Sequence, residues 1–209
     1  MKVNEIFLSI QGEGISTGYP TIFVRFTGCN LRCNYCDTTY SYEGGQEMTP
    51  EDIYKKIENF GYKRVCITGG EPLLQHDIMT LLDMLKKYEV NIETNGSVDI
   101  SGFNLSDSHR FTMDIKVPSS LESEKMKLSN FNFLRDIDEI KFVIGSKEDY
   151  EWSKKVIDKY YQKGIITFSP VFSQIEHQTI IEWILEDKLD VRFQLQIHKV
   201  IWNPNKRGV

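Results

Sequence analysis

The stretch PTIFVRFTGCNLRCNYC, residues 20–36, joins a predicted β-strand to a loop that is rich in cysteine. Residues 20–28 contain a run of β-branched and aromatic side chains, which is typical of a strand. The chain then passes directly into Cys29, Cys33 and Cys36, three cysteines within eight residues. We therefore expect the cysteine loop to lie at the end of a strand.

Strand and helix patterns alternate through the rest of the sequence. A helix is predicted from the N-cap Thr49, with Pro50 in its first position, to Gly61, and the next strand leads into the turn GGEP, residues 69–72. The predicted strands are 64–68, 90–94, 111–117, 139–144, 164–169 and 191–197, and further helices are predicted at 73–88, 147–163 and 173–187. This alternation predicts an α/β fold with a mostly parallel sheet, either open or rolled into a partial barrel.

Length and composition predict a single folded domain over residues 1–209. The 30 acidic residues outnumber the 25 basic ones, so the chain lacks the positive field that non-specific nucleic-acid binding requires, and we expect no nucleic-acid partner. No apolar run approaches the roughly 20 residues that span a bilayer, and the first residues lack a signal-peptide pattern. We therefore expect a cytoplasmic protein with no membrane partner.

Residues that could bind a ligand or take part in a reaction lie where the predicted strands end. Ligands of parallel sheets bind at the carboxyl ends of the strands, so these segments are expected to share one face of the molecule. They are the cysteine loop, GGEP, ETNG at 93–96, DIKVP at 114–118 and SPV at 169–171.

The three clustered thiols suit a soft metal site. A [4Fe-4S] cluster normally takes four cysteines, so a loop with three leaves one iron free for a non-protein ligand. A zinc site completed by Cys66 or by a histidine, or a chance grouping of core thiols, is the alternative. Cys66 stands between Val65 and Ile67 in a predicted strand, and we interpret it as a small core residue.

These motifs resemble those of the radical S-adenosylmethionine (SAM) enzymes. The loop has their three-then-two cysteine spacing with an aromatic residue, Tyr35, before the last cysteine, and GGEP matches their glycine-rich segment after the second strand. The resemblance implies a [4Fe-4S] cluster on Cys29, Cys33 and Cys36. It also implies that the free iron binds SAM, and that an electron from a partner such as flavodoxin or ferredoxin releases a 5'-deoxyadenosyl radical.

A narrower resemblance covers nearly the whole chain. EIFLSIQGEG at 5–14, TIFVRFTGC at 21–29, CDTTYS at 36–41 and IHKVIWNPNKRGV at 197–209 are similar to the 7-carboxy-7-deazaguanine synthase family. This implies a homodimeric lyase of queuosine biosynthesis that converts 6-carboxy-5,6,7,8-tetrahydropterin into 7-carboxy-7-deazaguanine with loss of ammonia. It further implies a truncated (β/α) barrel, since residues 95–110 and 119–137 lack clear helical patterns.

The resemblance also assigns roles to individual residues, none of them as a catalytic side chain. The implied magnesium ligand is Thr38, and the implied substrate contacts are Ile10, Gln11, Gly12, Glu13, Arg25 and Thr94. The implied SAM contacts are Tyr35, Cys36, Asp37, Gly69, Gly70, Glu71, Gly96, Asp114, Ile115, Lys116, Ser169, Pro170 and Val171. An arginine fork suits a substrate carboxylate.

Purely structural explanations remain open for some of these residues. Gln11 and Glu13 fit a solvated loop, Arg25 fits an exposed strand position, and Asp114 with Lys116 fits ordinary strand alternation. Two other functions also remain open at this point. One is a radical SAM enzyme that acts on a protein, as glycyl-radical activases do, and the other is a non-enzymatic zinc-binding module.

Overall fold

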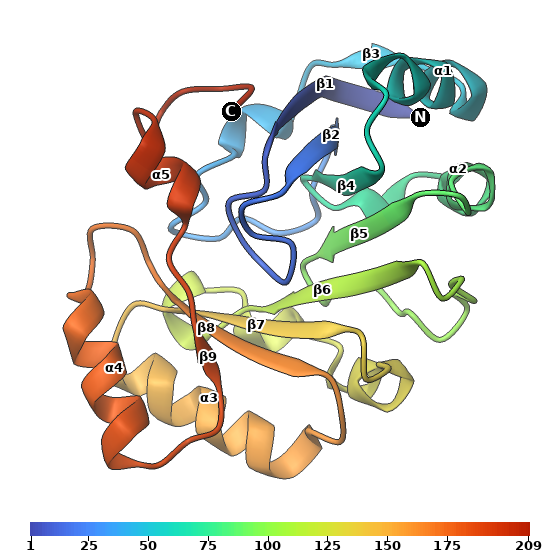
Figure 1. Ribbon diagram of the computed structural model, residues 1–209. Helices are drawn as coiled ribbons and strands as arrows, with labels where there is room; N and C mark the ends of the chain where they lie inside the picture. The colour runs from blue at the N-terminus through green and yellow to red at the C-terminus, as the bar shows by residue number, and fades with distance from the viewer.

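The computed structural model describes all 209 residues and contains one open sheet of nine strands (Figure 1). Seven strands run parallel in the order β2-β4-β5-β6-β7-β8-β9, and β1 joins the β2 edge antiparallel, with β3 beyond it. The predicted α/β fold with a mostly parallel, unclosed sheet is therefore confirmed. The strands are β1 (Lys2–Ile10), β2 (Pro20–Phe26), β3 (Gln46–Glu47), β4 (Arg64–Gly69), β5 (Glu89–Thr94), β6 (His109–Ile115), β7 (Glu139–Ile144), β8 (Ile165–Pro170) and β9 (Arg192–Phe193).

Helix α1 begins and ends as its sequence predicts. Thr49 and Asp52 form a capping box, and Gly61 ends the helix in the left-handed region, with a φ of 69°. None of the helices combines the length and apolar character that a membrane-spanning segment requires. The α-helices are α1 (Pro50–Phe60), α2 (Ile78–Met84), α3 (Lys147–Tyr160), α4 (His177–Glu186) and α5 (Ile197–Ile201).

The helix predicted over residues 73–88 is wrong in extent. The chain forms a short 3₁₀ helix, η2 (Pro72–Leu74), and starts α2 only at Ile78. Between them, Gln75 is extended, and its side chain accepts a hydrogen bond from the Lys2 N–H at 2.9 Å and donates to the Thr27 carbonyl at 3.1 Å. These bonds to the ends of β1 and β2 replace a helical turn.

The predicted strand 191–197 is also too long. β9 ends at Phe193, and Ile197 already begins α5. The Ile197 N–H donates to the Gly12 carbonyl, so the chain leaves the sheet edge to contact the loop that follows β1. The predicted helix 173–187 starts late, at His177, because Ser173 adopts a left-handed φ of 60° and Glu176, just before the helix, is extended.

Strand β1 and two segments without α-helices also bear on the predicted elements. β1 was not predicted as a strand, although it pairs with β2 over most of its length, and Phe7 stacks on Phe23 at 5.0 Å between ring centroids. Residues 95–110 and 119–137 contain no α-helix, as expected. The first segment is irregular until β6 begins at His109, and the second contains only short 3₁₀ helices. The helices that would complete a full barrel are therefore absent, and the truncated form is confirmed.

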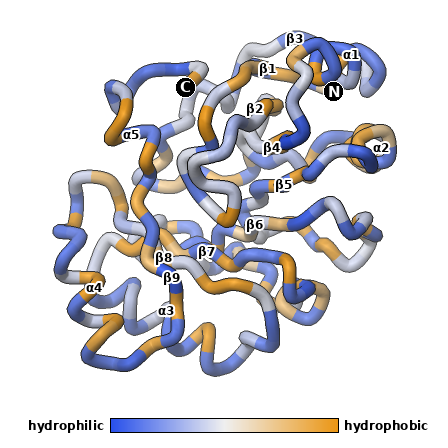
Figure 2. Tube along the Cα trace, in the orientation of Figure 1, coloured by the Kyte–Doolittle hydropathy of each residue, from blue (hydrophilic) through white to orange (hydrophobic).

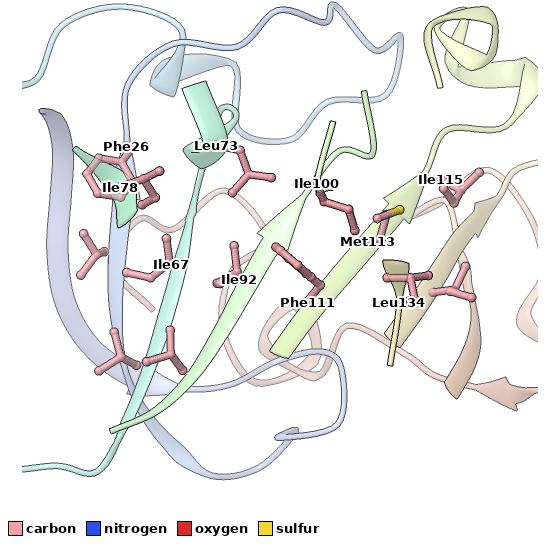
Figure 3. Packing of buried hydrophobic residues seen from close by; sticks show 14 of the residues in the cluster. Phe26, Ile67, Leu73, Ile78, Ile92, Ile100, Phe111, Met113, Ile115 and Leu134 are labelled. Carbon is pink, nitrogen blue, oxygen red and sulfur yellow. The ribbon is translucent and has the colours of Figure 1, made fainter. Parts of the chain in front are cut away.

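The two faces of the sheet have different chemistry. On one face, strand residues such as Ile67, Ile92 and Phe111 pack with Leu73 and Ile78 in a continuous apolar core (Figure 3). The hydrophobic positions along the strands and helices are orange in Figure 2, whereas the segment after α5 is mostly blue. Burial of the apolar face stabilises the fold and leaves the opposite face to polar side chains.

That opposite face carries a buried polar layer. The Glu139 carboxylate is fully buried and accepts hydrogen bonds from the hydroxyls of Thr112 at 3.0 Å and Thr167 at 2.5 Å. The Asn91 side-chain oxygen lies 2.9 Å from the same Thr112 hydroxyl and shares its single proton with Glu139. Because these groups satisfy one another, they form a rigid floor beneath the carboxyl ends of the strands.

Candidate active site

The cysteine loop lies between the end of β2 and a 3₁₀ helix, η1 (Thr39–Ser41). This confirms that the loop stands at the end of a strand. None of its thiols forms a disulfide, and all three are partly exposed on the wall of one cavity. They belong to Cys29, Cys33 and Cys36.

Burial raises the pKa of the Cys33 thiol to about 11, and burial also raises the pKa of Cys29. The Cys29 sulfur accepts weak hydrogen bonds from the Leu31 N–H at 3.5 Å and the Asn95 amide at 3.7 Å. Both cysteines are therefore protonated in the free chain at neutral pH. Metal binding at this loop would release protons and convert the thiols to thiolates.

The glycines of GGEP let the β4 turn approach the cysteine loop. Gly69 has a φ of 146°, and a Cβ on Gly70 would collide with the Gly28 carbonyl and lie 2.9 Å from the Cys29 Cβ. The Glu71 N–H donates to the same Gly28 carbonyl at 2.8 Å. This close backbone contact requires residues without side chains, so the motif does more than turn the chain.

The Glu71 side chain points into the protein rather than into the cavity. Its fully buried carboxylate accepts hydrogen bonds from the Leu73 N–H at 3.1 Å, the Thr94 hydroxyl at 2.8 Å and the Asn95 N–H at 2.7 Å. Burial raises its pKa to about 7, against the lowering effect of these donors. Glu71 thus ties the turn after β4 to the end of β5.

A cavity of about 910 Å³ opens beside the cysteine loop, at the carboxyl ends of the strands. Six basic and four acidic side chains line it, although the chain as a whole carries a net charge of -5. The excess of cations favours a ligand that carries carboxylate or other anionic groups. The basic residues are Arg25, Lys116, Lys141, Lys199, Lys206 and Arg207, and the acidic ones are Glu13, Asp37, Glu93 and Asp114.

Near the cysteines, Lys116 and Asp114 form an ion pair at 2.9 Å. Burial would lower the pKa of the Lys116 ammonium, but Asp114 and its other neighbours raise it above its ordinary value. The second Asp114 oxygen and the Tyr35 hydroxyl are buried without a hydrogen-bond partner. Because a buried polar atom without a partner is costly, these two atoms are available to a polar ligand in the cavity.

On β7, Lys141 is the strand neighbour of Asp114; it forms an ion pair with Glu13, which also accepts a hydrogen bond from Gln196. Burial alone would raise the pKa of Glu13, but Lys141 and the hydrogen bonds lower it below its ordinary value. Lys141 and Gln196 were not predicted from the sequence. Lys141 alternates with apolar residues in EIKFVI, so the only available signal was its place on one face of a strand.

Arg25 on β2 and Glu93 on β5 lie on the other side of β6 from Lys141. The Arg25 guanidinium donates to Glu5 at 2.8 Å, and the Glu93 carboxylate accepts from Thr68 at 2.9 Å and from the Gln11 amide at 3.3 Å. Gln11 is buried, so it is not part of a solvated loop. The strand and loop side chains therefore form one polar wall.

Thr38 lies at the cavity edge beside an ion pair. Its hydroxyl donates to Asp37 at 2.8 Å, and Asp37 pairs with Lys199 of α5 at 2.5 Å. Although burial would raise the pKa of Asp37, Lys199 and Thr38 lower it well below its ordinary value. The ion pair joins the C-terminal helix to the cysteine loop.

Most residues that were assigned by resemblance meet at this cavity. Its lining includes Ile10, Gln11, Gly12, Glu13, Arg25, Cys29, Cys33, Tyr35, Cys36, Asp37, Thr38, Gly69, Gly70, Thr94, Asp114, Lys116 and Val171. Five assigned residues lie outside the lining, namely Glu71, Gly96, Ile115, Ser169 and Pro170. Ile115 belongs to the apolar core, and a Cβ on Gly96 would contact its side chain.

Cys66 has a different environment from the three clustered cysteines. It is fully buried in β4, as expected of a small core residue, and its thiol faces Glu93 and Gln11. No group of three or more His, Cys, Asp or Glu side chains is arranged to hold a single metal ion. The structure therefore gives no support to a zinc site that Cys66 or a histidine completes.

A cysteine loop, a glycine turn and a polar cavity at the carboxyl ends of parallel strands define the radical SAM class. The family model described as "Radical SAM superfamily" matches residues 23–184 of the chain. This match covers most of the sheet and both motifs. Membership implies a [4Fe-4S] cluster and SAM as cofactors.

Individual relatives identify the branch of the superfamily. The chain is 47% identical to a 7-carboxy-7-deazaguanine synthase of Clostridium acetobutylicum, over 100% of this chain and 99% of that protein. It is 43% identical to one of Methanospirillum hungatei, over 98% and 86% of the two chains. The crystal structure of QueE from Escherichia coli superposes with a TM-score of 0.71 and 26% identity, covering 93% of each chain. The chain belongs to the 7-carboxy-7-deazaguanine synthase family.

The residues present fit the implied cofactors. Three partly exposed thiols on one loop provide soft ligands for iron and leave one cluster position free. Next to them, the Gly69–Gly70 backbone and the unpartnered atoms of Tyr35 and Asp114 offer polar contacts to a zwitterionic ligand.

Proposed function

We propose that this chain converts 6-carboxy-5,6,7,8-tetrahydropterin into 7-carboxy-7-deazaguanine, with release of ammonia, in queuosine biosynthesis. The proposal rests on one structural observation, that the cysteine loop lines a cation-rich cavity. The chain that forms this cavity matches a synthase of this name along its full length. When bound, the cluster and SAM supply one-electron chemistry that removes a hydrogen atom from the substrate and returns it.

We propose that the half of the cavity near the cysteine loop binds the cofactors. Cys29, Cys33 and Cys36 would ligate the cluster, while the backbone of Gly69 and Gly70 would accept hydrogen bonds from the SAM ammonium group. Other SAM contacts would come from Tyr35, Asp37, Asp114, Lys116 and Val171, which line the cavity. The other residues implied by the resemblance lie outside the lining in the free chain and would contact SAM only through backbone atoms or after a local adjustment; they are Glu71, Gly96, Ile115, Ser169 and Pro170.

The other half of the cavity would bind the pterin. Arg25 presents a guanidinium that suits the substrate carboxylate, and Gln11, Glu13 and Thr94 provide polar groups for the ring, with Ile10 and Gly12 beside them. Thr94 already donates its hydroxyl to Glu71, so toward a ligand it could act only as a hydrogen-bond acceptor. Together these residues would orient the ring and exclude water around C6, where hydrogen removal begins.

Thr38 is the proposed magnesium ligand. Magnesium takes few protein ligands and completes its shell with water and substrate oxygens, so a single hydroxyl at the cavity edge is compatible with this role. The ion would then orient the substrate carboxylate. Replacement of Thr38 with Ala should lower turnover and leave the cluster absorption unchanged, and equal activity with and without magnesium would contradict the assignment.

Anaerobic turnover tests the proposed reaction. The cluster-loaded enzyme, incubated with the pterin, SAM and a reductant such as dithionite, should form 7-carboxy-7-deazaguanine, detected by its ultraviolet spectrum and mass. The control mixture lacks only the pterin. If SAM is cleaved but no deazapurine forms, the pterin is not the substrate, and an enzyme that acts on a protein becomes the better reading.

The remaining proposals concern the oligomeric state, the reductant and the location of the enzyme. We propose a homodimer, a flavodoxin or ferredoxin as the reductant and a location in the cytoplasm. The small-molecule substrate fits the cavity, whose volume of about 910 Å³ lies within the usual range of ligand sites. Sedimentation of the purified chain would test the homodimer directly.

A further inference from the structure

The C-terminal segment contacts the loop after β1 in a regular pattern. Gln194, Gln196 and His198 alternate along the chain, and they meet the loop residues in reverse order. Gln194 hydrogen-bonds Gly14, Gln196 hydrogen-bonds Glu13, and the His198 ring covers Gly12 so closely that a Cβ there would collide with it. We call these three side chains the clasp.

Gln194 uses its whole amide in this contact. Its oxygen accepts from the Gly14 N–H at 2.5 Å, and its nitrogen donates to the Gly14 carbonyl at 3.0 Å and to the Thr17 hydroxyl at 2.7 Å. The side chain is buried, with 8% of its surface exposed, and it does not line the cavity. Its contacts therefore fix a neighbouring backbone and leave no group for a ligand.

Gln194 is also hydrogen-bonded to β8, near the edge of the sheet that lies opposite β1. Its backbone N–H donates to the Phe168 carbonyl of β8 at 2.9 Å. Gly14 has a φ of 72°, and a Cβ there would lie 2.8 Å from the Glu139 carboxylate of the polar floor. Gln194 thus joins the last strands of the sheet to the loop that follows the first strand, across the open side of the partial barrel.

This link fixes the orientation of Glu13. Gly12 and Gly14 on either side of it are both held by the clasp, and its carboxylate reaches Lys141 and Gln196 in the cavity. The loop has other anchors, because Arg110 donates to Ser16 at 2.5 Å. Loss of Gln194 should therefore loosen the loop without removing it from the fold.

We infer that Gln194 is a positioning residue, which holds Gly14 so that Glu13 and Gln11 meet the pterin in a fixed geometry. The inference rests on the proposed function for the identity of the ligand, but the clasp itself rests only on the contacts above. It also explains why the predicted strand 191–197 stops after Phe193. The side chains at alternating positions bind the loop in place of a neighbouring strand.

The test replaces Gln194 with Met, which keeps the volume and removes the hydrogen bonds. Gln178→Met is the matched control, since Gln178 is exposed on α4 and its side chain hydrogen-bonds Glu182 of the same helix. In the cluster-loaded enzyme with SAM, Gln194→Met should raise the KM for the pterin about tenfold or more, with a smaller loss of kcat, because a buried amide network is lost. SAM affinity should stay within about twofold of the parent value.

Hydrogen exchange gives a second readout that needs no turnover. Backbone amides of residues 11–18 should exchange faster in Gln194→Met and remain unchanged in Gln178→Met. Unchanged exchange, an unchanged KM, or an equal loss of SAM and pterin binding would each overturn the inference, since the last result is that of general destabilisation.

A milder variant covers the case in which Gln194→Met does not fold. Thr17→Val removes the hydroxyl that joins Gln194 to the Gly14 carbonyl, and it should give a smaller rise of the KM and of the exchange rate in the same residues. If the parent enzyme itself makes no deazapurine, the proposed function fails. The hydrogen-exchange result would then test only whether the clasp holds residues 11–18 in place.

Discussion

The four cysteines of the chain occupy two distinct environments. Cys29, Cys33 and Cys36 line the cavity, whereas Cys66 is fully buried on a strand beside Glu93. Replacement of any one of the three loop cysteines with Ala should abolish the iron and sulfide content after anaerobic reconstitution, because each would supply one of only three protein ligands. Cys66→Ala serves as the control and should retain the cluster, at a cost of about 1 kcal/mol in unfolding free energy. Equal iron loss in all four variants would contradict this division.

Glu71 gives a prediction for pH dependence. Its pKa is about 7 in the folded protein and near its ordinary value of 4.5 when unfolded. Between these values the folded state retains a proton that the unfolded state has released, so this group lowers stability as pH rises from about 4.5 to 7, by about 3 kcal/mol at most. Glu71→Gln cannot ionise and should flatten that part of the stability profile.

Urea unfolding at about pH 5 and about pH 7.5 would measure this difference. The control is Glu124→Gln, an exposed glutamate that should leave the pH profile unchanged. A parallel shift of the profile in Glu71→Gln, with the same slope as the parent, would show that Glu71 stays ionised throughout.

At the scale of elements, the turn after β4 determines how closely two motifs can approach. A Cβ on Gly70 would meet the backbone carbonyl of Gly28, and backbone cannot rotate away as a flexible side chain can. Gly70→Ala should therefore cost about 1–3 kcal/mol of stability, as overpacking does, and should lower SAM affinity about tenfold or more. Gly102→Ala is the matched control, because no atom lies within 4 Å of the place that its Cβ would occupy. Normal SAM binding by Gly70→Ala would show that the turn can relax without effect.

Sequence patterns predicted those elements whose signals are local. The α1 helix has its caps at Thr49 and Gly61, and its bounds are correct. The helix over residues 73–88 was wrong because Gln75 is held by hydrogen bonds to residues of β1 and to Thr27, which no local pattern encodes. β1 was missed although most of it lies within the quoted family segment 5–14, since its pairing with β2 is a contact between two separate stretches.

The same limit applies to the candidate site. The cysteines and glycines are recognised by spacing, and they do meet in space. Lys141 and Gln194 could not be found in this way, because their roles arise from partners more than 100 residues away in the chain. For Glu71, the structure adds a role that the motif does not encode, since its side chain supports the turn, and the implied SAM contact stays a prediction.

For the molecule as a whole, the C-terminal end of the chain lies at the cavity, whereas the N-terminus lies beside β3 and α1 (Figure 1). The C-terminal residues 204–209 line it, and the Arg207 guanidinium lies 3.8 Å from the centre of the Tyr40 ring. The Tyr40 hydroxyl donates to Glu5 at 3.0 Å, and Glu5 also holds Arg25. A continuous set of contacts therefore connects the C-terminal segment to the proposed carboxylate-binding arginine.

Removal of residues 203–209 tests this connection. The segment is mostly exposed, so the free energy of unfolding should change by less than about 1 kcal/mol, and the cluster should be retained. The KM for the pterin should rise about tenfold, because the cavity loses a wall and Arg25 loses the support that Tyr40 receives from Arg207. Arg207→Ala should give a smaller rise, and Lys163→Ala, which removes an exposed cation far from the cavity lining, should give none. Full turnover by the truncated enzyme at a pterin concentration below the KM would show that the segment covers the cavity without taking part in binding.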